Sequence, residues 1–435
     1  MNRKITHALL LAAVLSCSAA QADNRPMPGF RYDRNVTAPT GKEWEDPTMP
    51  ALNKERPHAW FFSFADEKQA LNVLPESSPY WKSLDGEWSF NWVGNPGERP
   101  ADFYKTNYDI SGWDKVQVPM NWNVVGIQKD GTQKYGTPIY TNQRVIFQHK
   151  VAVGDWKGGV MREPRKDWPT YKHRNEVGSY RRTFTVPAEW DGREVYLNFD
   201  GVDSFFYLYI NGRYVGFSKN SRNLASFDIS PYLVKGENTV AVEVYRNSDG
   251  SFLESQDMFR LPGIFRTVAL TAKPKVQVRD VVAIPDFDAN LVNASLNITA
   301  SVANLTKKDV KGLRVDYKLY EKALYGEATT PVKGAEASVP VAVNKNGETD
   351  AKVVLQAGAL VKKWSAEAPW RYVLVGELKD AKGRVLETFS TVVGFRKIEI
   401  KETAAADDEF GKAGRYYYLN GKPIKMKGVN RHETN

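Results

Sequence analysis

The chain has 435 residues and a formal net charge of +9, with 42% hydrophobic and 12% aromatic residues, a composition typical of globular rather than disordered proteins. This length allows two or three domains, each with a hydrophobic core of its own. The basic residues are scattered, without a basic block or a basic amphipathic helix, so we expect a solvated surface and no nucleic-acid partner.

Residues 1–22 have the pattern of a secretory signal, with two basic residues, an apolar run at 8–15 and the small-x-small cleavage site "AQA" at 20–22. The run is too short to cross a bilayer as a helix, so we predict no transmembrane span and an exported protein, periplasmic or extracellular. The stretch "VLSC" offers an alternative, because it approximates a lipoprotein cleavage box that would anchor the protein at Cys17. Cys17 is the only cysteine, so cleavage after Ala22 leaves a mature chain without disulfides.

After an extended segment at 23–49, strand patterns of period two recur between turn signals and predict an all-β domain at 50–272. In "SFFYLYINGRYVGF" two strands flank Asn211-Gly212, a pair typical of tight hairpin turns because both residues tolerate positive φ. Two further strands are expected to point alternate side chains inward, namely Val195, Leu197 and Phe199 in one and Val240, Val242 and Val244 in the other.

After Pro274 aromatic residues become rarer, and plain aliphatic alternation predicts an immunoglobulin-like sandwich at 273–396. The stretch "RYVLVGELKDAKGRVLETF" predicts a strand, a turn and a second strand. Two other strands are predicted from the alternating residues Ala294, Leu296, Ile298, Ala300 and Val302, and Leu313, Val315, Tyr317 and Leu319.

Residues 397–435 have a different character. Strand-forming residues at 416–419 and 423–429 flank Asn420-Gly421, which predicts a hairpin that leads into one further strand. A single strand cannot bury itself, so this last strand requires a domain beyond the two sandwiches.

The residues alone identify no catalytic constellation. No two of the five histidines (His7, His58, His149, His173 and His432) have metal-ligand spacing, and no nucleophile, phosphate-binding or dinucleotide motif is present. Carboxylates are too numerous for one pair to stand out. Three polar stretches rich in amides, acids and aromatics, at 138–142, 216–222 and 248–266, are candidates for a binding site; the alternative is that each is a loop that satisfies its own backbone.

The order and wording of several stretches resemble the N-terminal half of glycoside hydrolase family 2 β-galactosidases. The matching pieces are "EWEDP", "SLDGEWSFNW", "VPMNW", "PIYTN", "FDGVDSFFYLYINGRYVGFSKNSR", "RNSDGSFLESQDMFRLPGIFR", "WSAEAP", "VGFRKIEI", "LNGKP" and "GVNRHE". They run from position 43 to position 433 in the expected order.

The resemblance implies an all-β arrangement: a jelly-roll sugar-binding domain, an immunoglobulin-like domain, and at 397–435 the first strand of a (β/α)8 barrel whose remainder is absent. Family enzymes are retaining glycosidases that remove terminal β-D-galactose and use magnesium and sodium. Their two catalytic glutamates and their magnesium ligands lie on later barrel strands. We therefore predict that this chain alone has no catalytic residues, binds no cofactor and is inactive, and that a full-length enzyme forms homo-oligomers.

The resemblance also assigns three substrate-binding positions. Asn142 matches an amide that the jelly-roll domain contributes to the galactosyl site, and His432 matches a barrel histidine that contacts the sugar. Asn220 in "KNSR" stands where the family pattern has an acid that holds sodium and a sugar hydroxyl. Loss of that carboxylate puts sodium use in doubt.

Two other functions remain open at the level of sequence: a carbohydrate-binding protein without catalysis, and an inactive truncated gene product. The glycoside is also open, because the sequence does not separate a β-galactoside from a β-glucuronide or a β-mannoside.

Overall fold

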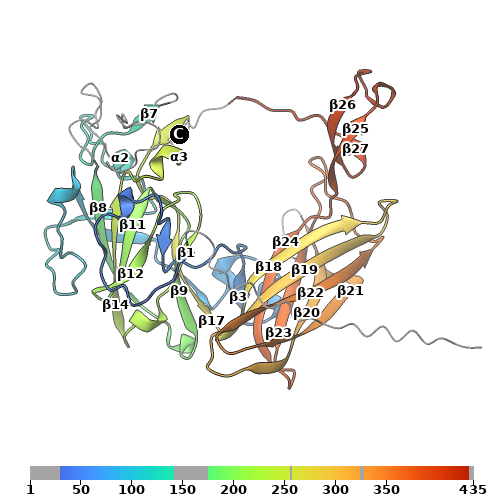
Figure 1. Ribbon diagram of the computed structural model, residues 1–435, viewed down its shortest axis with the longest axis horizontal. Coiled ribbons are helices and arrows are strands. Elements are labelled where there is room, and N and C mark those ends of the chain that lie inside the picture. The colour runs from blue at the N-terminus through green and yellow to red at the C-terminus, as the bar shows by residue number, and fades with distance from the viewer. Residues whose placement is uncertain (1–29, 142–174, 255–256, 324–327, 431–435) are drawn as a thin grey trace, which may run out of the picture.

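The computed structural model describes residues 30–141, 175–254, 257–323 and 328–430, and all structural statements below refer to these residues. They form two β-sandwiches that lie side by side, followed by a small hairpin sheet (Figure 1). The predicted signal at 1–22, including Cys17, lies outside the described residues. Among the residues described, no helix is both long and apolar enough to span a membrane.

The first sandwich packs an eight-stranded sheet against a four-stranded sheet. The larger sheet has the order β1 (Phe30–Arg31), β2 (Ala51–Leu52), β12 (Arg213–Ser218), β11 (Phe205–Ile210), β14 (Glu237–Tyr245), β8 (Val177–Thr185), β5 (Gly86–Val93) and β6 (Asp114–Val118). The smaller sheet has the order β13 (Ala225–Asp228), β9 (Glu194–Phe199), β17 (Val268–Lys273) and β4 (Trp81–Ser83). This confirms the predicted all-β jelly-roll class.

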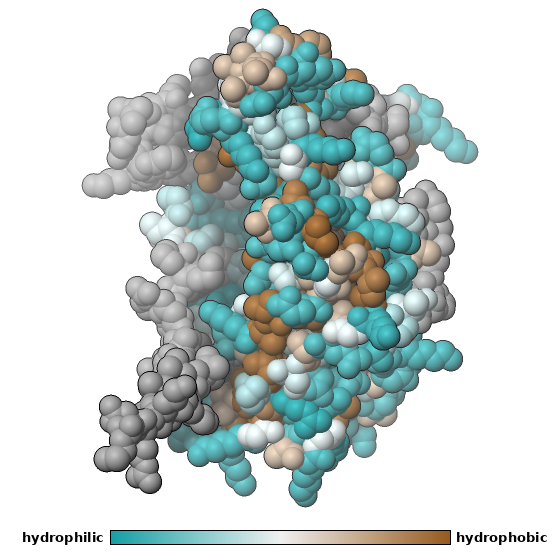
Figure 2. Space-filling model, turned by 90° about the vertical axis from the view of Figure 1, so that its right-hand side faces the viewer, coloured by the Kyte–Doolittle hydropathy of each residue, from teal (hydrophilic) through white to brown (hydrophobic). Residues whose placement is uncertain are grey.

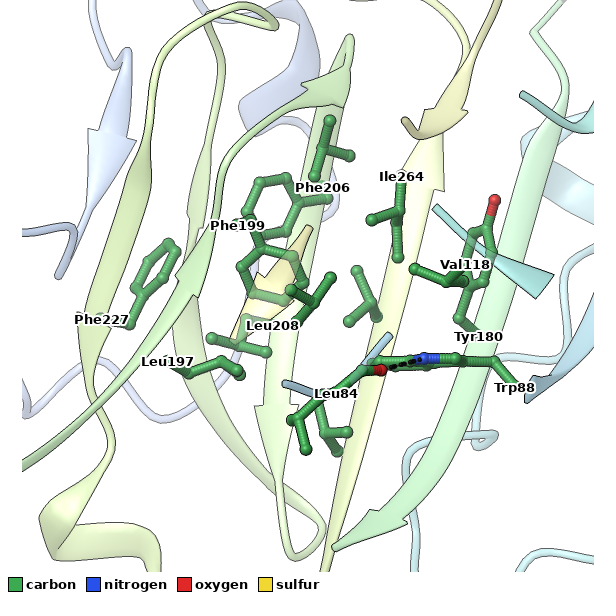
Figure 3. Close-up of a cluster of buried hydrophobic side chains, with 14 of the residues drawn as sticks. Leu84, Trp88, Val118, Tyr180, Leu197, Phe199, Phe206, Leu208, Phe227 and Ile264 are labelled. Carbon is green, nitrogen blue, oxygen red and sulfur yellow. Dashed lines mark hydrogen bonds between the residues drawn. The ribbon is translucent and has the colours of Figure 1, made fainter. Parts of the chain in front are cut away.

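Side chains from both sheets meet in the core of this sandwich (Figure 3). The alternating residues predicted to face inward on β9 and β14 are all buried here. Trp88 of β5 is almost fully buried, and its indole N–H donates to the Leu84 carbonyl at 2.9 Å. A buried polar atom needs such a partner, so this hydrogen bond allows the large ring to lie in the core.

The predicted hairpin turn at Asn211-Gly212 joins β11 to β12, with positive φ at both residues (51° and 75°). Both faces of β11 are buried, because the N-terminal segment covers the face that points away from the core. In that segment Glu43 accepts a hydrogen bond from Tyr207 at 2.5 Å, and Trp44 stacks on Tyr245 at 5.7 Å between ring centroids.

The second sandwich packs a three-stranded sheet against a five-stranded sheet, as expected of an immunoglobulin-like domain. The three-stranded sheet has the order β18 (Val276–Phe287), β19 (Ala294–Asn304) and β22 (Gly347–Gly358). The five-stranded sheet has the order β21 (Ala328–Val343), β20 (Val310–Lys322), β23 (Arg371–Lys379), β24 (Val385–Val393) and β3 (Phe62–Phe64). The aliphatic residues predicted to alternate on β19 and β20 all lie in its core.

One strand connects the two sandwiches. β3 lies within the predicted first domain at 50–272 but pairs antiparallel with β24 of the second sandwich. Phe61, just before β3, packs in the second core, with its ring 5.7 Å from that of Phe389. The hydrogen-bonding partner of so short a strand depends on distant residues, so its own sequence does not predict it.

The hairpin sheet consists of β25 (Ile398–Thr403), β26 (Gly414–Leu419) and β27 (Lys422–Pro423), with the predicted turn at Asn420-Gly421. The further strand predicted at 423–429 is wrong beyond Pro423, because residues 424–430 form no strand. A barrel strand is held by parallel neighbours, and the described residues offer none to this segment. The face in Figure 2, formed by the second sandwich and the hairpin, is largely hydrophilic with a broken band of hydrophobic side chains.

The remaining elements are short. Two two-stranded sheets pair β10 (Val202–Asp203) with β16 (Gly263–Ile264) and β7 (Ile139–Thr141) with β15 (Met258–Arg260). The α-helices are α1 (Glu67–Ala70), α2 (Trp122–Val125) and α3 (Ser251–Glu254). Single 3-10 turns are η1 (Glu43–Glu45), η2 (Pro75–Ser77), η3 (Pro96–Glu98), η5 (Ala188–Trp190), η6 (Ser230–Tyr232) and η7 (Ala405–Asp407).

The packing of Trp88 gives a first prediction. Trp88→Ala should lower the free energy of unfolding of the first sandwich by about 3–5 kcal/mol, because it removes a buried indole and leaves a cavity. Trp60→Ala is the matched control, since Trp60 is 61% exposed and should cost less than about 1 kcal/mol. Chemical denaturation followed by circular dichroism measures both, and equal losses would show that Trp88 does not anchor this core.

Candidate functional site

The three polar stretches selected from the sequence come together at one loop edge of the first sandwich, near α2 and α3 in Figure 1. β7, from the stretch at 138–142, pairs with β15, from the stretch at 248–266. The stretch at 216–222 joins them, because an Arg222 guanidinium N–H lies 3.6 Å from the Met258 sulfur. We call this region the loop edge; it consists of β7, residues 218–222, and the segment from α3 to β15.

Asn220 is the one predicted site residue whose position the structure describes. It is exposed and has a left-handed backbone conformation (φ 76°), which asparagine tolerates better than most residues. Asn142 directly follows β7 in sequence but lies outside the described residues, as does His432. The joint site of these three residues therefore stays a prediction.

The backbone beside Asn220 is held by a carboxylate. Glu254 of α3 accepts hydrogen bonds from the Ser221 backbone N–H at 2.7 Å and from the Ser221 hydroxyl at 2.6 Å. Ser221 is completely buried, so these two bonds satisfy groups that water cannot reach. The consequence is that Asn220 is presented to solvent from a fixed backbone.

A second carboxylate lies next to this contact. Asp203 of β10 accepts a hydrogen bond from Arg222 at 3.0 Å. Burial raises the pKa of Asp203 to about 6, and the nearby Glu254 charge also raises it, whereas Arg222 lowers it. Asp203 therefore changes protonation state just below neutral pH.

The loops behind the edge are joined by a buried ion pair. Glu176 and Arg246 lie 2.5 Å apart, and both side chains are 2% exposed. The same carboxylate accepts hydrogen bonds from the Trp122 indole at 3.1 Å and the Asn123 amide at 3.3 Å, while Arg246 donates to the Thr137 carbonyl at 3.0 Å.

A glycine makes room for this arrangement. Gly136 has φ +72°, and a Cβ at this position would lie 2.4 Å from a Glu176 carboxylate oxygen. No larger residue fits there without moving the carboxylate. The loop at 126–136 can therefore pack directly against the ion pair.

Aromatic side chains contribute an apolar surface to the loop edge. Tyr140 of β7 is 41% exposed and Phe259 of β15 is 38% exposed, with their ring centroids 5.4 Å apart. The Tyr140 hydroxyl donates a hydrogen bond to Asp257. Exposed rings beside amides and carboxylates suit a ligand with both apolar C–H faces and hydroxyl groups, which is the chemistry of a sugar.

The described part of the loop edge does not by itself fit the cations implied by the resemblance. At the predicted sodium position the side chain is the neutral amide of Asn220, and the described residues contain no group of three His, Cys, Asp or Glu side chains placed to hold a metal. We therefore derive no chemical step through a metal.

The sequence selected the stretches but not the interactions within them. Asp203 and Glu254 both lie in segments rich in aromatic residues, "VDSFFYLY" and "SFLESQDMF". An acid in such a segment was the available sequence signal for a site residue. Their partners could not be predicted, because Glu254 binds a residue 33 positions away and Asp203 binds one 19 positions away.

Comparison with known proteins adds two family matches. Residues 81–274 match the sugar-binding domain of glycosyl hydrolases family 2, and residues 276–396 match the domain described as glycosyl hydrolases family 2. The β-galactosidase of Priestia megaterium is 36% identical over 402 residues, which are 92% of this chain and 35% of that protein. The β-galactosidase of Halalkalibacterium halodurans is 32% identical over 390 residues, 90% of this chain and 34% of that protein.

The chain thus spans about a third of the length of these curated relatives. Among solved structures, a Bacteroides uniformis β-glucuronidase has a TM-score of 0.57 at 21% identity, over 81% of this chain and 35% of that one. At this identity the likeness concerns the fold alone.

The buried ion pair gives a second prediction. Arg246→Met should lower the free energy of unfolding by about 3–5 kcal/mol, because it leaves the Glu176 carboxylate buried without its cation. The double variant with Glu176→Gln should recover part of this loss. Arg384→Ala is the control, since Arg384 is 77% exposed in its pair with Asp380 and should cost about 0–1 kcal/mol. Similar losses for Arg246→Met and Arg384→Ala, measured by denaturant titration, would contradict this account.

The raised pKa of Asp203 gives a third prediction. Between about pH 4 and pH 6 the folded chain retains a proton that the unfolded chain has lost, so Asp203 makes stability fall as pH rises through this window. Asp203→Asn should remove this dependence, and its stability relative to the parent should rise by up to about 3 kcal/mol between pH 4 and pH 7. Unfolding free energies at both pH values measure the difference; a constant difference would refute the assignment.

Proposed function

Because this chain belongs to glycosyl hydrolases family 2, through the sugar-binding domain at 81–274 and the domain at 276–396, we propose that it serves the hydrolysis of terminal β-D-galactose residues. In this proposal the loop edge of the first sandwich is the part that recognises the sugar. The observation that carries it is the convergence of three separate polar stretches on one edge, which also carries the exposed rings of Tyr140 and Phe259.

The choice of galactoside is supported by the curated relatives. The β-galactosidases of Priestia megaterium and Psychromonas ingrahamii are 36% and 31% identical over about 90% of the chain, whereas the Bacteroides uniformis β-glucuronidase is 21% identical over 81% of it. A residue such as Asn220, neutral and exposed, also suits a neutral sugar.

We propose further that the described residues do not catalyse the reaction themselves. Retaining hydrolysis requires two carboxyl groups about 5 Å apart, one as nucleophile and one as acid and base. At the loop edge Glu254 accepts hydrogen bonds from Ser221 and Asp257 accepts one from Tyr140, while behind the edge Asp203 binds Arg222 and Glu176 binds Arg246. These carboxylates therefore serve to hold the loops in place. Residues that only position a sugar, such as Asn220 in this proposal, cannot form a covalent intermediate, because that step requires a nucleophile.

A carbohydrate-binding protein without catalysis is the second candidate, favoured by the same exposed rings and committed carboxylates. The two candidates share the loop edge and differ in whether the chain cooperates with a catalytic barrel. Export, with removal of residues 1–22, fits both and remains part of the proposal.

A complementation assay tests the proposed function. The purified chain should not hydrolyse an aryl β-galactoside above background, because it lacks the carboxylate pair. Addition of a separately expressed fragment of the Priestia megaterium β-galactosidase, covering the part this chain does not match, should restore hydrolysis. In that mixture Asn142→Ala should lower the rate by about 10-fold or more, the usual effect of losing a hydrogen bond made in the transition state.

Asn290→Ala is the matched control, because Asn290 is an exposed asparagine of the second sandwich, far in sequence from the loop edge. It should leave the restored rate unchanged. Robust hydrolysis by the chain alone, retained through a second purification, would contradict the proposed division of roles. Lactose binding without any restored hydrolysis would favour the second candidate.

A further inference from the structure

A cavity of about 970 Å³ lies between the two sandwiches, away from the loop edge. Its floor is the outer face of the four-stranded sheet, on the side of the first sandwich that faces the second (Figure 1). Its walls come from residues 54–63 and from the second sandwich, through segments that include Arg279 and Glu348. This volume is at the upper end of the range for small-molecule sites.

The floor is a polar surface with a regular arrangement. Side chains alternate on strands, so the residues of β9 that point away from the core point into the cavity, including Tyr196 and Asn198. The strand register places two rows side by side across the sheet: one row holds Ser226, Asn198 and Ala269, and the next holds Asp228, Tyr196, Thr271 and Trp81.

Two ionisable side chains at the cavity have no partner of their own among the described residues. Lys54 is 8% exposed and its ammonium makes no hydrogen bond or ion pair with any described residue. Glu55, which follows it, makes no side-chain hydrogen bond with a described residue. Burial lowers the pKa of Lys54 to about 8 and raises the pKa of Glu55 to about 7, and Asp228 raises the latter further.

The Lys54 ammonium is not one of the fully enclosed side-chain atoms without a hydrogen-bond partner, so it keeps access to the cavity and can donate to a ligand there. Lys54 offers donors and Glu55 offers acceptors, and a sugar hydroxyl can satisfy either kind.

Some of the other charges around the cavity form ion pairs with one another. Arg34 binds Asp228, and Arg279 binds Glu348 at 2.9 Å. Basic and acidic side chains line the cavity in nearly equal number, so no excess charge favours an ionic ligand. The rings of Trp60 and Trp81 supply apolar faces.

We infer that this cavity is a second carbohydrate site, specific for a short neutral saccharide. The cavity floor around Asn198 and the Trp81 ring receives the sugar, and Lys54 and Glu55 bind its hydroxyl groups. The inference extends the proposed function, because it rests on carbohydrate as the ligand of this protein. It places a binding site on the sheet face, separate from the loop edge at which hydrolysis is proposed to occur.

Calorimetric titration of the 435-residue chain with lactose tests the inference. Lys54→Met and Asn198→Ala should each weaken lactose binding by about tenfold or more, the effect of one lost hydrogen bond to a charged or amide group. Lys54→Met should not lower the melting temperature, since it removes a desolvated charge without a partner. Reduced affinity at unchanged or raised stability separates ligand binding from a structural role. Lactobionate, an anionic analogue of lactose, should bind at least several-fold more weakly.

Tyr140→Ala at the loop edge distinguishes this inference from the proposed function. It should leave binding at the cavity unchanged. If Tyr140→Ala abolishes all lactose binding while Lys54→Met and Asn198→Ala have no effect, the loop edge is the sugar site and the second site is wrong. Failure of the folded chain to bind lactose at millimolar concentration would likewise overturn the second site, while the complementation assay would still decide the proposed function.

Discussion

The ion pair between Glu176 and Arg246 is the interaction on which the loop edge depends. Each ion would be costly to bury alone, and the Trp122 indole, the Asn123 amide and the Thr137 carbonyl add hydrogen bonds that stabilise the buried pair. Through these contacts the Glu176 carboxylate, which directly precedes β8, binds α2 and Arg246, which directly follows β14. The loop that ends at Gly136 packs against the same carboxylate. Arg246 donates to the carbonyls of Thr137, just before β7, and Arg260 of β15, so the ion pair reaches the two short strands that carry the exposed rings of the edge.

Much of the fold follows from local pattern. Alternation predicted the buried residues of β9, β14, β19 and β20, and Asn211-Gly212 predicted the hairpin turn, because side-chain direction and positive φ are properties of a few adjacent residues. The partner of β3 and the ion pair of the loop edge escaped prediction, since each joins residues far apart in sequence. The strand expected at 423–429 depends on neighbours that the described residues do not provide.

At the site, too, local sequence features were predicted and contacts between distant residues were not. The polar composition selected the stretches that meet at the loop edge, and the resemblance assigned the site residues. Asn220 is the single assigned residue that the structure describes, and Asn142 and His432 stay predictions. The cavity was not foreseen at all, because it arises from two sandwiches that face each other. Its polar floor includes the residues of β9 that lie between the alternating residues predicted to face the core. A strand pattern shows which side chains leave the core and does not show what they meet.

The central claim is that the loop edge of the first sandwich recognises a galactosyl group, and hydrogen–deuterium exchange with and without millimolar lactose tests it most directly. The account predicts slower exchange in peptides that cover β7, residues 218–222 and the segment from α3 to β15, because a bound sugar orders this edge and excludes water from it. Unchanged exchange in these peptides, in a chain that binds lactose by calorimetry, would contradict the claim.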